Sequence, residues 1–207
     1  MLQQMDLFLS ANGLGSCWQG IPRLTKELLE SSNLEFVIVM AFGKPKDPQS
    51  LHRTNISEFK RKPLKKITDI NGVDNLLEAA RVAPSGANWQ PWFFTGNSGL
   101  IYVRKAKSSS IKSFASKIAH FKELDYTDIG IAIYHLQVAA EHFGKKTEIV
   151  FDQTAKVNAS KNLSKFLILT QQNSTKFCML RFFGFRKCYA FSSTPKGYEY
   201  ITSLKIE

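Results

Sequence analysis

The chain has 207 residues, of which 43% are apolar and 22% charged, and its formal net charge is +11. These proportions are typical of a globular protein and exclude disordered and fibrous classes. The sequence contains no uncharged apolar run of 18 residues, and its first six residues lack the basic start of a signal peptide. The three cysteines are too few and too scattered for a disulfide scaffold or a four-thiolate zinc site. We therefore expect a cytoplasmic protein with no membrane partner and no metal.

The positive charge is concentrated towards the end of the sequence. Residues 1–150 carry a net charge of +5, and residues 151–207 carry +6. An anionic partner such as a phosphate or a nucleic acid would bind to such charge, but a solvated basic surface would carry it equally well. No zinc-finger spacing and no RNA-stacking aromatic signature accompanies it. A basic nucleic-acid-binding module is therefore the last-ranked alternative, and we expect no nucleic-acid partner.

The first part of the chain predicts two helices, a strand and a linker. Apolar residues at helical spacing predict a helix over residues 1–12, which Asn12-Gly13 ends, and a short helix over 23–31. The apolar run Glu35 to Ala41 predicts a buried strand. Residues 44–70 are polar, basic and interrupted by three prolines, so they predict a linker. We interpret its basic residues as solvated rather than as a phosphate site: Lys44, Lys46, Arg53 and the run 60–66.

The second part predicts alternating helices and strands. A helix is expected over 73–83, capped by Asn71 or Asp74. The pattern then predicts, in chain order, a hairpin of strands at 92–95 and 99–103, a helix over 128–143 ended by Gly144, and strands at 147–151, 166–170 and, after a turn at Pro195-Lys196-Gly197, 198–206. Helices and short strands thus mix without regular βαβ alternation, which favours an α+β fold.

A weak internal repeat relates the two parts. When Gly13 is set over Gly144, the segment before each glycine is an apolar helix and the segment after it is an apolar run. Met5 then aligns with Leu136, and Leu9 with Ala140. Apolar helix patterns match easily, so the repeat suggests two related half-units without establishing them.

The passage Ala79 to Trp92 contains the strongest candidate motif, Ala-Pro-Ser-Gly-Ala-Asn-Trp-Gln-Pro-Trp. A helix ends there, and the turn after it exposes backbone N–H groups, a hydroxyl and an amide. Such a turn can edge a flat heteroaromatic ligand, because glycine permits close approach and asparagine both donates and accepts hydrogen bonds. The same pattern also fits an ordinary helix-ending turn that places two tryptophans in a core.

A second candidate motif, Asn12-Gly-Leu-Gly-Ser-Cys-Trp18, follows the first predicted helix. It is not a dinucleotide-binding fingerprint, because that requires a preceding strand, a following helix and a third glycine. A helix cap followed by a turn would explain it equally well.

Taken together, the two motifs resemble the FMN-dependent nitroreductase family. Members carry the Pro-Ser motif before the Gly-Leu-Gly motif, whereas here the order is reversed. This order, with the internal repeat, resembles the tandem branch, in which one chain carries two nitroreductase-like halves as a pseudo-dimer. The resemblance implies an α+β fold with a mixed, largely antiparallel sheet packed by helices. It divides the chain into the end of a first half (1–45), a basic linker and the start of a second half (46–70), that second half (71–160), and a basic C-terminal segment with a closing strand (161–207).

The resemblance also implies a cofactor site between the halves. One half would line FMN with its Pro-Ser turn, and the other would approach it with its glycine turn. The implied cofactor-binding residues are Pro84, Ser85, Gly86 and Asn88 from one half and Gly13, Leu14, Gly15 and Ser16 from the other. NAD(P)H would be the co-substrate, and a nitro compound, quinone or similar small molecule the electron acceptor. Because the flavin performs the chemistry, no catalytic side chain is implied.

The family's Arg-x-Ser-x-Arg element, which holds the FMN phosphate, has no good match here. It would precede the first predicted helix, so the chain resembles an N-terminally truncated member, and the stretch Arg53 to Arg61 matches it poorly. Charge-assisted hydrogen bonds to a phosphate contribute about 1.5–3 kcal/mol each, so their loss would weaken binding strongly. A non-catalytic flavin-binding or vestigial domain is therefore the second hypothesis. Truncation of a pseudo-dimer would also expose apolar surface and favour a homo-oligomer.

Overall fold

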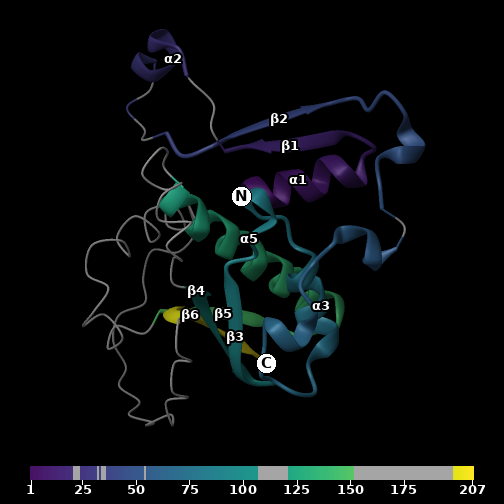
Figure 1. The fold of residues 1–207 in the computed structure, drawn as a ribbon, viewed down its shortest axis with the longest axis vertical. Helices are drawn as coiled ribbons and strands as arrows, with labels where there is room; N and C mark the ends of the chain where they lie inside the picture. Colours follow the sequence, from purple (N-terminus) through teal and green to yellow (C-terminus); the bar gives the residue numbers. More distant parts are fainter. Residues whose placement is uncertain (21–23, 32, 34–35, 54, 107–120, 152–197) are drawn as a thin grey trace.

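An antiparallel sheet with the strand order β3–β4–β6–β5 forms the centre of the fold (Figure 1). Its strands are β3 (Trp92–Asn97), β4 (Leu100–Ala106), β5 (Thr147–Val150) and β6 (Tyr198–Ile206). The structure, a computed structural model, describes residues 1–20, 24–31, 33, 36–53, 55–106, 121–151 and 198–207. The predicted hairpin, the strand at 147–151 and the closing strand are confirmed. The predictions for 166–170 and 195–197 lie outside the described residues.

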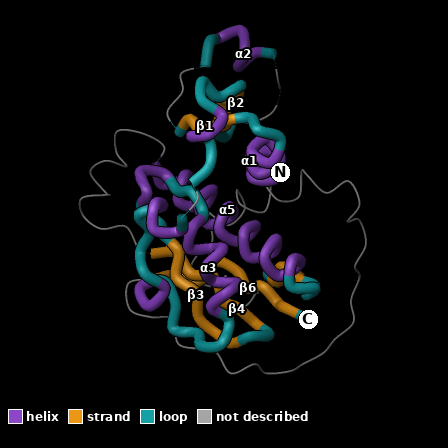
Figure 2. Tube along the Cα trace, turned by 90° about the vertical axis from the view of Figure 1, so that its right-hand side faces the viewer, coloured by secondary structure: helices purple, strands orange, loops and turns teal. Residues whose placement is uncertain are grey.

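Two helices cover this sheet and bury the largest part of the core. They are α3 (Asp74–Val82) and α5 (Phe121–His142), which pack against each other above the strands (Figure 2). Both helices were predicted, although α5 begins seven residues earlier than expected. The side chains with almost no exposure come from both layers: Leu77, Trp92, Phe94, Ile129, Leu136 and Leu204. Burial of each such side chain contributes about 1.5–3 kcal/mol to folding.

The predicted side-chain cap of α3 is wrong. Val73 occupies the N-cap position, and no side chain there accepts a hydrogen bond from the helix. Val73 is itself buried in the core, so packing rather than capping places the start of this helix.

A smaller unit lies on the far side of α5 from the main sheet (Figure 1). It comprises α1 (Leu2–Ala11), β1 (Gly15–Gln19), α2 (Lys26–Glu30) and β2 (Val39–Gly43), with β1 and β2 paired antiparallel and α1 packed against β1. The first two helices were predicted, but β1 was read as a turn. The prediction of a buried strand over Glu35 to Ala41 is wrong: β2 begins at Val39, and its residues are half-buried or exposed. An apolar run predicts burial only where a second layer packs on it, and among the described elements it is α1 that packs against this two-stranded sheet.

The predicted linker, residues 44–70, contains three short 3-10 turns: η1 (Pro48–Ser50), η2 (Ile56–Phe59) and η3 (Leu64–Lys66). Its last residues belong to the core. Ile67 is 1% exposed, and its carbonyl accepts a 2.7 Å hydrogen bond from the Phe94 N–H, while Thr68 forms a parallel bridge with Phe94. The prediction of a linker is therefore wrong at Ile67 and Thr68, which are part of the core. The four-stranded sheet is antiparallel, and this isolated bridge adds a parallel contact at β3, which agrees with the predicted α+β fold.

The helices α1 and α5 end in the same way. Gly13 and Gly144 have left-handed φ angles of 73° and 71°. The residue after each glycine donates a 2.9 Å hydrogen bond to the carbonyl five residues back, which is Leu9 after α1 and Ala140 after α5. Each glycine also bonds to the carbonyl three residues back, at 3.0 and 2.9 Å. Both helices thus end in the same glycine cap and continue into an antiparallel strand pair.

None of the helices in the described ranges has the length and apolarity needed to cross a bilayer.

Candidate functional site

The turn after α3 adopts a strained backbone conformation. Ala87, Asn88 and Gln90 all have positive φ angles, of 48°, 56° and 48°. A left-handed conformation costs a residue other than glycine about 1–2 kcal/mol, and such strain concentrates at functional sites. Ser85 holds the turn, because its carbonyl accepts from the Asn88 N–H and its hydroxyl oxygen accepts from the Gln90 N–H, both at 3.0 Å. Ala87 and Asn88 are exposed at its tip.

A buried carboxylate from α5 fixes the start of this turn. The N–H of Gly86 donates to both oxygens of Asp128, at 3.0 and 3.1 Å. Asp128 is 5% exposed, so this contact takes place away from bulk water. A charge-assisted bond to a backbone N–H is stronger than a neutral one, especially where water is excluded. Asp128 thereby ties the turn to the long helix.

Residues 60–62 of the predicted linker contact the turn on the side opposite to Asp128. The Arg61 guanidinium donates to the side-chain oxygen of Asn88, and the Asn88 amide donates to the Lys60 carbonyl at 3.1 Å. The Lys62 ammonium donates to the carbonyls of Trp89 and Gln90, both at 2.9 Å. The interpretation of the run 60–66 as solvated is therefore wrong for Arg61, which is half-buried, whereas Lys62 is exposed although it bonds to the turn. It failed because Asn88, the partner of Arg61, lies 27 residues away in the sequence.

Positive charge gathers beside residues 60–62. Arg53 and Arg61 place their guanidinium carbons 5.0 and 6.0 Å from the centre of the Phe59 ring. Burial lowers the pKa of Arg61, and the nearby charges of Arg53 and Arg81 lower it further. Arg81 is itself paired with Glu78, which raises its pKa. An anion placed among the three arginines would relieve their mutual repulsion.

The Gly13-Leu14-Gly15-Ser16 stretch lies at the junction of α1 and β1. The Ser16 hydroxyl donates to the Asp6 carboxylate on α1. Residues 51 and 52 lie beside this junction, because a Cβ on Gly15 would be 3.5 Å from Leu51, and the Ser10 hydroxyl is 3.4 Å from the His52 ring.

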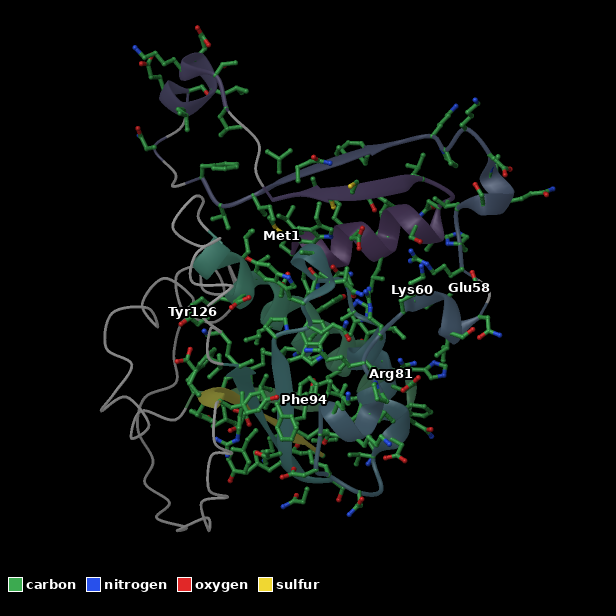
Figure 3. The ribbon with its side chains drawn as sticks, in the orientation of Figure 1. Met1, Glu58, Lys60, Arg81, Phe94 and Tyr126 are labelled. Carbon is green, nitrogen blue, oxygen red and sulfur yellow. The ribbon has the colours of Figure 1, made fainter. Side chains whose placement is uncertain are left out.

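Within the described residues, no hydrogen bond joins this junction directly to the turn at Pro84–Asn88. The segment 51–62 contacts both, and Figure 3 shows Lys60 and Arg81 on this flank.

His135 on α5 lies within hydrogen-bond distance of both α1 and α3. One ring nitrogen of His135 lies 3.1 Å from the Gln3 amide nitrogen on α1, and the other lies 3.1 Å from the Ala79 carbonyl on α3. Desolvation lowers the pKa of His135 below its ordinary value. A neutral ring can accept from Gln3 and donate to Ala79, so the neutral form fits this junction. Within the described ranges, no group of three or more His, Cys, Asp and Glu side chains is arranged to hold a metal ion.

A sequence model of the family described as "Putative TM nitroreductase" matches residues 1–140, more than half of the chain. The chain belongs to this nitroreductase family. A crystal structure from Thermotoga maritima with the same kind of description is similar, with 23% identity and a TM-score of 0.48 over 73% of this chain and 57% of that one. An FMN-dependent nitroreductase from Clostridium difficile has 16% identity and a TM-score of 0.34, over 72% of this chain and 83% of that one. No curated protein matched.

The chain thus spans 57% of the length of the Thermotoga maritima nitroreductase-family structure. The matched range includes both candidate motifs and the walls of the strained turn. Sequence reasoning missed two site residues, Asp128 and Arg61. Asp128 stands at the first position of the predicted helix 128–143, where an acidic residue also suits an ordinary helix start. Arg61 lies within a run of lysines, which suggested a solvated surface.

Proposed function

We propose that this nitroreductase-family chain is an FMN-dependent oxidoreductase. The observation that carries the proposal is the strained turn Ser85–Gln90, held by Asp128 on one side and by Arg61 and Lys62 on the other. Strain of this kind persists only where the surrounding structure enforces it. A turn fixed in this way offers a preorganised edge for a planar ligand.

The residues around the turn fit the parts of FMN. The exposed backbone at Ala87 and Asn88 suits the edge of an isoalloxazine ring, and the Ser85 hydroxyl can still donate a hydrogen bond. The guanidinium groups of Arg53 and Arg61 suit a dianionic phosphate, which neither residue was expected to bind. Asn88 already uses its side chain on Lys60 and Arg61, so we assign it to shaping the turn as well as to lining the ring.

FMN, when bound, would supply hydride transfer between NAD(P)H and a nitro, quinone or similar acceptor. The chain would bind and orient the reactants, and we assign no acid, base or nucleophile to a side chain. The segment Gly13 to Ser16 would approach the cofactor from the other half, as in a pseudo-dimer. Its support is the repeated glycine cap, together with segment 51–62, which contacts both regions.

The test is flavin retention followed by turnover. Purified protein is incubated with excess FMN, desalted, and its visible spectrum recorded, with riboflavin as a parallel probe. We expect a retained flavin band with FMN and a weaker one with riboflavin, and NAD(P)H oxidation only when a nitroaromatic or quinone is present. Protein that stays colourless would overturn the proposal. Flavin retention without nicotinamide oxidation would instead indicate a non-catalytic flavin-binding domain.

A further inference from the structure

A chain of side-chain hydrogen bonds runs from β1 into the layer of helices. The Ser16 hydroxyl on β1 and the Gln3 amide on α1 donate to the two oxygens of the Asp6 carboxylate, the amide at 3.0 Å. The same amide nitrogen lies 3.1 Å from one ring nitrogen of His135 on α5, and the other ring nitrogen lies 3.1 Å from the Ala79 carbonyl on α3. We call Ser16, Asp6, Gln3 and His135 the polar chain. It connects one of the proposed cofactor residues to three helices.

The chemistry of its members fixes the direction of every bond in the polar chain. The Ala79 carbonyl only accepts, so a neutral His135 ring carries its proton on Nδ1 and accepts from Gln3 on Nε2. The two amide hydrogens of Gln3 are then used on His135 and Asp6. The carboxylate of Asp6 also only accepts, so Ser16 must donate its hydroxyl proton to it. The Ser16 oxygen therefore faces any further partner as a hydrogen-bond acceptor.

Gln3 is an unfavourable residue for its place in the fold. It is 5% exposed, and the other buried residue of α1 is Leu9, so an apolar side chain would suit this position. The Gln3 side-chain oxygen is buried without a hydrogen-bond partner among the described residues, which carries a desolvation penalty. Turning the amide over would set that oxygen against the Asp6 carboxylate. The two bonds that the amide donates, to Asp6 and to α5, account for the presence of a glutamine here.

We propose that Asp6, held by Gln3, is a positioning residue that presents the Ser16 oxygen to the cofactor. This inference rests on the proposed FMN site, to which Ser16 is assigned. The isoalloxazine ring of a flavin carries an N–H and its ribityl chain carries hydroxyl groups, and the Ser16 oxygen can accept a hydrogen bond from either. The charge of Asp6 behind Ser16 repels a phosphate, so Ser16 meets the uncharged part of the cofactor. Asp6 acts through Ser16 rather than by contact with the flavin.

A double-mutant cycle on the full chain tests this role, with flavin affinity measured by fluorescence titration. Ser16→Ala and Asp6→Ala should each weaken the binding of both FMN and riboflavin by about three- to tenfold, as expected for the loss of one hydrogen bond. The double variant should bind no more weakly than Ser16→Ala alone, because Asp6 acts through Ser16. Ser16→Thr keeps the hydroxyl and should keep the affinity. Gln4→Ala, on the exposed side of the same helix, is the matched control and should leave both affinities unchanged.

A second variant separates positioning from stability. Gln3→Leu places an apolar side chain of similar size at a buried position, so it should fold whether or not Asp6→Ala does, and circular dichroism checks both. Because it releases Asp6, it should weaken flavin binding in the otherwise wild-type chain but not in Ser16→Ala. Lumiflavin, which keeps the ring N–H and lacks the ribityl chain, identifies the donor. Weaker lumiflavin binding by Ser16→Ala assigns the ring N–H, and unchanged lumiflavin binding assigns a ribityl hydroxyl.

The outcomes separate this inference from the function on which it rests. A wild-type chain that binds neither FMN nor riboflavin overturns the proposed function and this inference with it. A wild-type chain that binds both, with affinities that Asp6→Ala and Gln3→Leu leave unchanged, overturns the positioning role alone. Losses that add up in the double variant overturn it as well, since Asp6 and Ser16 would then act independently.

Discussion

The contact between Asp128 and Gly86 shows how one side chain can enforce an unfavourable backbone. Three residues of the turn have left-handed φ angles, and none is glycine. Their conformational cost is offset locally by bonds at both ends of the turn, from Asp128 and from Lys62. Removing one of these bonds should therefore loosen the whole turn rather than a single residue.

Asp128→Ala should destabilise the protein by about 1–3 kcal/mol, because it leaves a partly buried N–H without its acceptor. Asp128→Asn should destabilise the protein less, since one side-chain oxygen remains to accept the hydrogen bond. Urea unfolding gives the free energy, and amide exchange at Gly86 reports the contact itself. Glu141→Ala on the exposed side of the same helix is the control and should change neither measurement. Unaltered Gly86 exchange in Asp128→Ala would contradict the assignment.

Arg53→Gln should weaken FMN binding by about tenfold or more, because a charge-assisted bond to phosphate contributes about 1.5–3 kcal/mol. Riboflavin lacks the phosphate, so its affinity should stay the same. Fluorescence titration with both flavins measures this ratio. Lys65→Gln, an exposed cation in η3, serves as the comparison and should leave both affinities as they are. Equal losses of affinity for FMN and riboflavin would show that Arg53 does not bind the phosphate.

At the scale of elements, replacing the glycine that caps α1 or α5 should lower the stability of the protein measurably. Nothing lies within 4 Å of a Cβ built on Gly13 or Gly144, so substitution there is penalised by the φ angle alone. Gly13→Ala and Gly144→Ala should each destabilise by about 1 kcal/mol. Gly43 has equal space and no positive φ, so Gly43→Ala should not destabilise. Thermal unfolding of the three variants checks this, and three equal losses would contradict it.

The junction of α1, α3 and α5 should make stability depend on pH through His135. Desolvation lowers its pKa below 6.5, Asp6 and the Ala79 carbonyl act against this shift, and Arg61 adds to it. Below about pH 6.5 the unfolded chain takes up a proton that the folded chain resists. Stability is therefore fully present above that pH and is lost as the pH falls towards the folded pKa.

Urea midpoints measured between about pH 7.5 and about pH 5 should fall for the wild type. The urea midpoint of the His135→Gln variant should fall less steeply over the same pH range. His142→Gln, at the exposed end of α5, should follow the wild-type curve. If His135→Gln retained the full slope, another group would be responsible.

Sequence patterns predicted most elements, because α3, α5 and the β3–β4 hairpin carry their periodicity locally. The patterns failed where burial depends on packing against residues distant in the sequence. Ile67 looks like part of a polar linker but is buried by a partner 27 residues away, Phe94. β2 looks like a core strand, but its residues are half-buried or exposed in the part of the chain that the structure describes. At the site, the turn 84–90 was recognisable, whereas Asp128 was not, since its role depends on a residue 42 positions away.

At the scale of the whole molecule, the described residues form one well-buried sheet and one whose residues are half-buried or exposed. β3, β4 and β6 contribute several side chains with no exposure, whereas β1 and β2 contribute none. Regions with few buried apolar contacts open locally at lower free energy than the core.

In dilute protein, amide exchange should therefore be fastest in β1 and β2 and slowest in β4 and β6. The expected difference is about 100-fold or more, equivalent to about 2.7 kcal/mol of opening free energy. Mass spectrometry of peptic fragments measures it. Uniform protection across both sheets would mean that the whole chain opens as one cooperative unit.

The position of β6 in the sheet has a consequence for biosynthesis. β6 follows the other described strands, yet it separates β4 from β5. While the ribosome is still adding residues, the β3–β4 hairpin and β5 cannot be joined, and both present open edges. Strand pairings distant in the chain form slowly and leave nascent chains prone to aggregation. Newly made chains should therefore depend on chaperones until synthesis has passed Ile206.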